Sequence, residues 1–297
     1  MPYFPPAPGG GVLLPNTIDD AMLVDMPAGT VKGRALGAGT GDPQNLTSTQ
    51  LVALTGIPFG QCRLALVSTT VMRLSRHNGC LLTIDNVPQV IPAAGVDLAP
   101  TGITNGVIYY IYAYMASGVM TLLPSTLAWV IDPRNGMKVL SSNAACTLVG
   151  LTRGDNGNVW PYNRTDFVGL LSYFNRRNLV TLSASFNGFT TSSGTPVVIA
   201  ASAAYFLCWG DEAVLLYASG FSSNGVLSHN SAALGLDGGG FAAGQTMYIS
   251  VAGSNVPFAA TMAGAPSEAV LHNSGVLAWV SAGTGTFFGN AGAMVRG

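Results

Sequence analysis

From Gln61 onward, apolar and polar residues alternate with a period of two, which is typical of half-buried β-strands. The apolar segment 62–76 is followed by the sequence HNG at 77–79 and then by a second apolar segment, 80–91. Asn-Gly between two β-rich runs is a strong signal for a tight hairpin. We therefore predict one strand over 62–76, a turn at 77–79 and a second strand over 80–91.

A further hairpin is predicted over 106–125, where the sequence ASG separates two apolar runs. Alternation along the first run places Tyr110, Tyr112 and Tyr114 on one face of a strand. Packing of these tyrosines against a second sheet is the simpler interpretation. The functional hypothesis is an aromatic face that contacts a ligand or another subunit.

The same pattern of short apolar runs and turn signals continues to the end of the chain. Further strands are predicted over 127–131, 137–140, 146–153, 167–174, 179–186, 195–200, 205–209, 213–221, 246–253, 256–262 and 275–281. Many short strands separated by turns predict an all-β fold of the β-sandwich or jelly-roll type. We predict two such domains, 61–178 and 179–297.

One short helix is predicted before the strands, in a glycine-rich connector over 27–60. Thr47 is a good N-cap, and Gln50 follows three residues later to complete a capping box, with Leu46 and Leu51 in the positions of a hydrophobic staple. Gly56 supplies a stop signal. The glycines upstream of Thr47 lack the strand and acidic residue of a dinucleotide site and the G-K-[ST] of a P-loop.

The first 26 residues are predicted to form an extended arm, because four prolines and three consecutive glycines within residues 2–11 prevent regular structure. The arm nevertheless carries the apolar residues Tyr3, Phe4, Leu13 and Leu14. Apolar side chains on a segment that cannot fold alone suggest docking onto another protein. A frayed terminus is the alternative.

Charge is scarce and unevenly placed. Only 8% of the 297 residues are charged, and no Lys or Arg lies between Arg177 and Arg296. This split is the basis for the domain boundary at 178.

The apolar stretches do not predict a membrane protein. Polar residues and Pro124 interrupt every long apolar stretch, so no membrane-spanning helix is predicted. Neither half has the basic stripe of a nucleic-acid surface. The remaining explanation is that uncharged flanks are buried against other copies of the chain.

The sequence offers little for catalysis or for a cofactor. Its four cysteines and three histidines are scattered without the spacing of a metal site, so buried reduced thiols are expected and no metal or cofactor is predicted. Glycoside hydrolysis needs a pair of carboxylates. The neighbours Asp211 and Glu212 are expected to face opposite ways and to solubilise a hairpin turn. No G-x-S-x-G elbow is present, and we expect no enzymatic activity.

Three stretches of sequence resemble the fibre and receptor-binding proteins of tailed bacteriophages and of related prophage-derived particles. The first is MPAGTVKGRALGAGTGDPQNLTSTQL at 26–51. The second runs from GVIYYIYAYMASGVMTLLPS at 106–125 to SYFNRR at 172–177. The third extends from about 179 to the end and includes PSEAVLHNSGVLAWVSAGTGT. Together they cover most of residues 19–297, and their order is more specific than any one of them.

The resemblance implies a homotrimer on the virion surface, on the tail or on the capsid exterior. It implies that the arm contacts other virion proteins and that the particle attaches to a polysaccharide or other glycan of the host cell. A tail fibre or receptor-binding protein is the first expectation. A head fibre or capsid decoration protein with a mainly structural role is the second, and a polysaccharide-degrading spike is the third.

Overall fold

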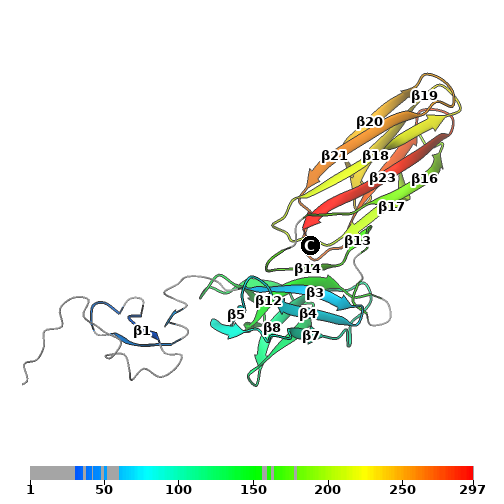
Figure 1. The fold of residues 1–297 in the computed structure, drawn as a ribbon. Coiled ribbons are helices and arrows are strands. Elements are labelled where there is room, and N and C mark those ends of the chain that lie inside the picture. Colours follow the sequence, from blue (N-terminus) through cyan, green and yellow to red (C-terminus); the bar gives the residue numbers. More distant parts are fainter. Residues whose placement is uncertain are drawn as a thin grey trace, which may run out of the picture. The chain divides into compact units, whose positions relative to one another are not determined.

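The computed structural model describes residues 31–35, 38–41, 43–47, 50–51, 60–155, 159–161, 164–176 and 179–296. The chain divides into two compact units, Met1–Ile57 and Pro58–Gly297. Regular structure in the described residues is almost entirely β-strand, so the predicted all-β fold is confirmed (Figure 1). No helix in this part of the chain has the length and apolar content to cross a membrane.

The first unit contains a small antiparallel hairpin of β1 (Val31–Gly33) and β2 (Gln44–Leu46). The predicted capping box follows it. Thr47 N donates to Gln50 Oε1 at 2.9 Å, and Gln50 N donates to Thr47 Oγ1 at 3.2 Å. Leu51 N also donates to Thr47 O at 2.9 Å, so a helical turn begins where it was predicted. The predicted stop at Gly56 lies outside the described residues.

The second unit begins with a β-sandwich, which we call the first sandwich. One layer consists of β3 (Cys62–Ser68), β4 (Val71–Arg76) and β7 (Val96–Leu98), together with the separate pair β5 (Leu81–Ile84) and β6 (Val87–Val90). The other layer has the order β10 (Trp129–Ile131), β11 (Lys138–Leu140), β12 (Asn143–Arg153), β8 (Ile108–Ala116) and β9 (Val119–Ser125), with β14 (Leu170–Ser172) also paired to β12.

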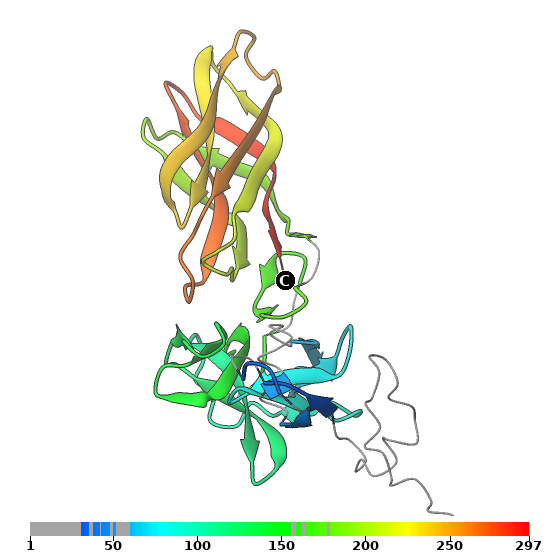
Figure 2. The same ribbon diagram turned by 90° about the vertical axis from the view of Figure 1, so that its left-hand side faces the viewer.

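The second sandwich consists of two five-stranded sheets (Figures 1 and 2). One sheet has the order β13 (Phe167–Val168), β17 (Val197–Phe206), β22 (His272–Val280), β19 (Ser228–Leu236) and β20 (Gly239–Ile249). The other has the order β15 (Leu179–Thr181), β23 (Gly285–Arg296), β18 (Val214–Asn224) and β21 (Val256–Gly264), with β16 (Ala184–Thr191) also paired to β23. The strand β13 precedes the predicted boundary at 178 and yet pairs with β17 in parallel.

The hairpin predicted at 77–79 is wrong. The long predicted strands on either side are each folded back on themselves, as β3 with β4 and as β5 with β6. The strand before the turn was expected to pair with the strand after it, but Gln61 forms hydrogen bonds with the second strand instead. Its N–H donates to Leu81 O, and its side-chain oxygen accepts from Leu81 N. A Cβ at Gly79 would lie 2.2 Å from the Gln61 Cδ, so glycine is needed there for this insertion.

The tyrosine strand β8 alternates as predicted. Tyr109, Ile111 and Ala113 are buried in the core of the first sandwich. Tyr110 and Tyr112 belong to a second cluster of buried side chains, which continues into the core between the sheets of the second sandwich. The two sandwiches therefore share one apolar cluster, and the tyrosine face contributes to it.

All four cysteines carry free thiols, and three of them, Cys62, Cys146 and Cys208, are buried. Burial raises the pKa of Cys62 to about 12, and burial followed by nearby carboxylates raises the pKa of Cys208 to the same value. These groups are therefore neutral thiols at physiological pH. The expectation that the cysteines are buried is confirmed for these three residues.

We predict that Tyr112→Phe lowers the free energy of unfolding by about 1 kcal/mol. Tyr112 is fully buried, and its hydroxyl donates to Leu127 O at 2.9 Å, so the substitution leaves a carbonyl without this donor. Tyr114→Phe, on the same face of β8 but only half-buried, is the control and changes stability less. Urea unfolding of both variants measures the difference, and equal midpoints would contradict the prediction.

Candidate functional site

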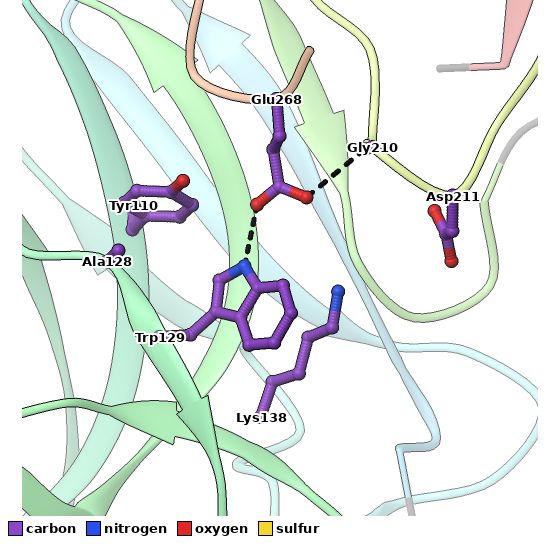
Figure 3. Close-up of a pocket in the computed structure, with 7 residues that line it drawn as sticks. All are labelled: Tyr110, Ala128, Trp129, Lys138, Gly210, Asp211 and Glu268. Carbon is purple, nitrogen blue, oxygen red and sulfur yellow. Dashed lines mark hydrogen bonds between the residues drawn. The ribbon is translucent and has the colours of Figure 1, made fainter. Parts of the chain in front are cut away.

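A pocket of about 490 Å³ lies where the two sandwiches meet (Figure 3). It combines aromatic rings, carboxylates and one ammonium group. Its lining residues are Tyr110, Ala128, Trp129 and Lys138 from the first sandwich and Gly210, Asp211 and Glu268 from the second.

The hairpin of β10 and β11 positions Trp129 and Lys138. Ile131 pairs with Lys138, so Trp129 and Lys138 are diagonal neighbours on one face of the hairpin. The connecting turn is held by Asp132, whose N–H donates to Met137 O at 2.8 Å and whose side chain is 2% exposed. The Arg134 guanidinium holds the pKa of the Asp132 carboxyl below its usual range, so the carboxylate remains available to stabilise the turn.

Glu268 connects the two sandwiches. Its Oε1 accepts from Trp129 Nε1 at 2.6 Å, and its Oε2 accepts from Gly210 N at 3.2 Å. Figure 3 shows the carboxylate between these two donors, with Tyr110 beside it and Lys138 near the opposite edge of the indole. Burial, with a smaller contribution from the negative charge of Glu268, raises the pKa of Tyr110 to about 12. Tyr110 therefore remains a hydrogen-bond donor at physiological pH.

Lys138 lies among three aromatic rings. Its Nζ is 3.6 Å from the ring centroid of Trp129, 5.1 Å from that of Tyr173 and 5.8 Å from that of Trp209. These distances are within the range of cation–π attraction. Burial is the main reason that the pKa of Lys138 is lowered. The described residues provide no hydrogen-bond acceptor for this ammonium group, which points into the pocket (Figure 3).

Arg176 fixes the turn that carries Asp211. Its two terminal nitrogens bind the two Asp211 oxygens at 3.0 and 3.1 Å, and Nη1 also binds Glu212 Oε1 at 2.7 Å. The expectation that Asp211 and Glu212 face opposite ways is therefore wrong, because both carboxylates reach the same guanidinium. The expected turn is present, since Glu212 N donates to Trp209 O, and the Asp211 side chain is 58% exposed there.

The structure places the residues predicted from sequence in different environments. Tyr110 lines the pocket, whereas Tyr112 is fully buried and can contact neither a ligand nor a second subunit. Tyr114 is half-buried and lines a second, smaller cavity of about 290 Å³. Thr47 and Gln50 are in the first unit, where they cap the helix. Residues Tyr3, Phe4, Leu13 and Leu14 lie outside the described residues.

Sequence reasoning missed Trp129, Lys138 and Glu268. Trp129 and Lys138 fell within predicted strands, and Glu268 within one of the resemblance motifs, but no local pattern linked them. Trp129 and Glu268 are 139 positions apart. The available signal was that Glu268 is one of only four acids in a long segment without Lys or Arg.

The geometry suits binding of a ligand rich in hydroxyl groups. Carboxylates accept hydrogen bonds, an ammonium group donates them, and an aromatic wall contacts apolar surface. No three His, Cys, Asp or Glu side chains of the described residues form a group that could hold a metal ion.

No protein-family model matches the chain, and no curated protein matches it significantly. Three solved structures are similar to it at low scores. They are the T13 viral particle of IBDV (10% identity, TM-score 0.33, 67% of this chain and 52% of that chain), the insecticidal delta-endotoxin Cry8Ea1 from Bacillus thuringiensis (7%, 0.28, 80% and 51%) and the infectious bursal disease virus Gx strain (10%, 0.29, 81% and 73%). The chain spans about half the length of the first two. These values are too low to support an argument about fold or function.

We predict that Arg176→Met lowers the free energy of unfolding by about 3 kcal/mol, because it leaves the buried Glu212 without its cation. The double variant Arg176→Met, Glu212→Gln removes that charge as well and recovers most of the loss. Arg164→Met, which breaks an exposed pair with Asp166, is the control and has little effect. Urea unfolding measures all three, and wild-type stability in the single variant would contradict the prediction.

Proposed function

We propose that this chain is a virion surface fibre or spike protein that attaches the particle to a glycan on the host-cell surface. The observation that carries the proposal is the pocket with Trp129, Tyr110, Lys138, Asp211 and Glu268 at its walls. The resemblance to phage fibre and receptor-binding proteins, which covers most of the sequence, supplies the biological setting.

A sugar matches this combination of groups. Its hydroxyls both donate and accept hydrogen bonds, so they can pair with Asp211 and Glu268 and with Lys138. Its C–H surface can lie against an aromatic ring such as Trp129. The pocket volume of about 490 Å³ is within the usual range for small-ligand sites. Many copies on one particle would strengthen weak individual contacts through avidity.

We further propose that the chain forms a homotrimer through the second sandwich. On β18 the buried residues Val214, Leu216 and Ala218 alternate with Leu215 and Phe221, which are 39% and 38% exposed. Phe221 stacks on Phe288 of β23 with ring centroids 4.8 Å apart. Arg296 is the only charged residue in the five strands of this sheet.

A sheet face of this kind is suited to packing against another copy of the chain. Contiguous apolar surface marks interaction sites, and the cores of interfaces are poor in charge and rich in aromatic residues. An uncharged patch meets its own copy without like-charge repulsion. The same observation favours the second candidate function, a head fibre or capsid decoration protein whose role is mainly structural. The N-terminal arm, with Tyr3 and Phe4, is the proposed attachment to other virion proteins in either case.

Adsorption competition tests the attachment role. We expect that saturating free protein lowers the adsorption of particles that carry this chain. Trp129→Ala should raise the concentration needed for half-inhibition by at least about tenfold, because it removes a pocket wall. Tyr248→Ala removes an aromatic side chain that is 56% exposed outside the pocket, and it should compete as the wild type does. Unchanged adsorption at saturating wild-type protein would contradict the proposal and favour the structural role.

Self-association has its own test. Light scattering on purified protein should give about three times the mass of the 30.5 kDa chain. Phe221→Glu should shift the mass toward the monomer, because it places a charge in the proposed interface. Leu227→Glu, at a site that is 59% exposed between β18 and β19, is the control and should leave the mass unchanged. A monomeric wild-type protein would contradict the trimer.

A further inference from the structure

Resting on the glycan-binding role above, we propose that the pocket takes a neutral sugar residue and discriminates against sugars that carry a carboxylate. The glycan role alone does not specify this, because acidic and neutral polysaccharides both occur as sugar ligands in general. Three features of the described residues point to the neutral class: the unpaired donors, the remaining acceptors and the local charge.

The donors belong to Lys138. An ammonium group has three N–H donors, and the described residues accept none of them. The neighbours of its Nζ are the rings of Trp129, Tyr173 and Trp209, at 3.6 to 5.8 Å from their centroids. Aromatic faces attract a cation but do not replace directed hydrogen bonds. The group is therefore available to donate to a ligand oxygen in the pocket.

The acceptors belong to Asp211 and Glu268. Arg176 fixes both Asp211 oxygens, and Trp129 Nε1 and Gly210 N fix those of Glu268. Each carboxylate oxygen has a further lone pair. The hydrogen bonds already present hold both carboxylates in place. A ligand that donates to these lone pairs therefore costs the two side chains little further conformational entropy. They require a ligand that donates hydrogen bonds.

Local charge decides between an acidic and a neutral ligand. Among the described residues, the carboxylates of Asp211, Glu212 and Glu268 outnumber the two cations Lys138 and Arg176, so these five groups together carry a net charge of −1. Arg176 is already occupied by two carboxylates. An anionic ligand would gain one ammonium and meet a net negative surrounding, whereas a neutral hydroxyl can accept from Lys138 and donate to a carboxylate at once.

The test compares matched sugars that differ only at C6. Binding of glucose, galactose and mannose, and of the corresponding uronates, is measured by saturation-transfer NMR titration of the full chain at low ionic strength. We expect at least one neutral sugar to bind, and we expect the affinity for its uronate to be lower by at least about tenfold. A uronate that binds as well as its neutral partner, or better, would overturn this inference and leave the glycan role intact. If none of the three sugars and three uronates binds, the result would contradict both the preference for neutral sugars and the glycan-binding role.

Variants connect the selectivity to the residues. Lys138→Met keeps much of the aliphatic bulk and removes the hydrogen-bond donors, so it should lower the affinity for the neutral sugar about tenfold. Lys32→Met replaces the other lysine of the chain, in the first unit, and should leave binding unchanged. Asp211→Asn removes one negative charge from the pocket and should narrow the difference between each sugar and its uronate. Unchanged neutral binding in Lys138→Met, or unchanged discrimination in Asp211→Asn, would contradict the assignment.

Discussion

The junction of the two sandwiches depends on the guanidinium of Arg176. It binds Asp211 through both terminal nitrogens and Glu212 through one, and the Glu212 side chain is only 8% exposed. Burial of a carboxylate is costly unless a cation and hydrogen bonds compensate it. Once this turn is fixed, Gly210 N is directed at Glu268, and Glu268 in turn holds the Trp129 indole. The geometry of the pocket is therefore a consequence of how one buried carboxylate is neutralised.

The same logic explains the segment without Lys or Arg. It contains four acids, and each has a partner that does not require a local Lys or Arg. Asp211 and Glu212 use Arg176, which precedes the segment, and Glu268 uses the neutral donors Trp129 Nε1 and Gly210 N. Asp237 lies 2.8 Å from His272 Nδ1 and accepts from Asn273 N at 2.9 Å. Charge in this half of the chain thus stabilises specific turns, and the strand faces are left without it.

Local patterns predicted the elements whose causes are local. The capping box needs only Thr47 and Gln50, and the hairpin of β8 and β9 needs only a turn in which Ser117 and Gly118 adopt positive φ. Prediction failed at 77–79 because Gln61, a residue outside the turn, takes the ladder hydrogen bonds. The strand β23 was missed because its sequence is rich in small residues. At Gly292 a Cβ would lie 1.9 Å from Leu182 O, so the close approach of the backbone requires glycine there. Glycine has a low strand propensity, and the sequence of β23 therefore did not look like a strand.

The site was less accessible to sequence reasoning than the fold, for a physical reason. Alternation correctly placed Tyr110 and Tyr112 on one face, but alternation cannot distinguish a buried face from a ligand face, and the shared apolar cluster buries Tyr112 while Tyr110 reaches the pocket. Tyr110 lines the pocket together with Glu268 of the other sandwich, whereas the hydroxyl of Tyr112 donates to Leu127 O. A strand pattern specifies which side chains share a face, and only the packing of a second sheet determines which part of that face stays open. A pocket formed between two sandwiches is therefore a property of their contact, and its residues carry no common signal in either one.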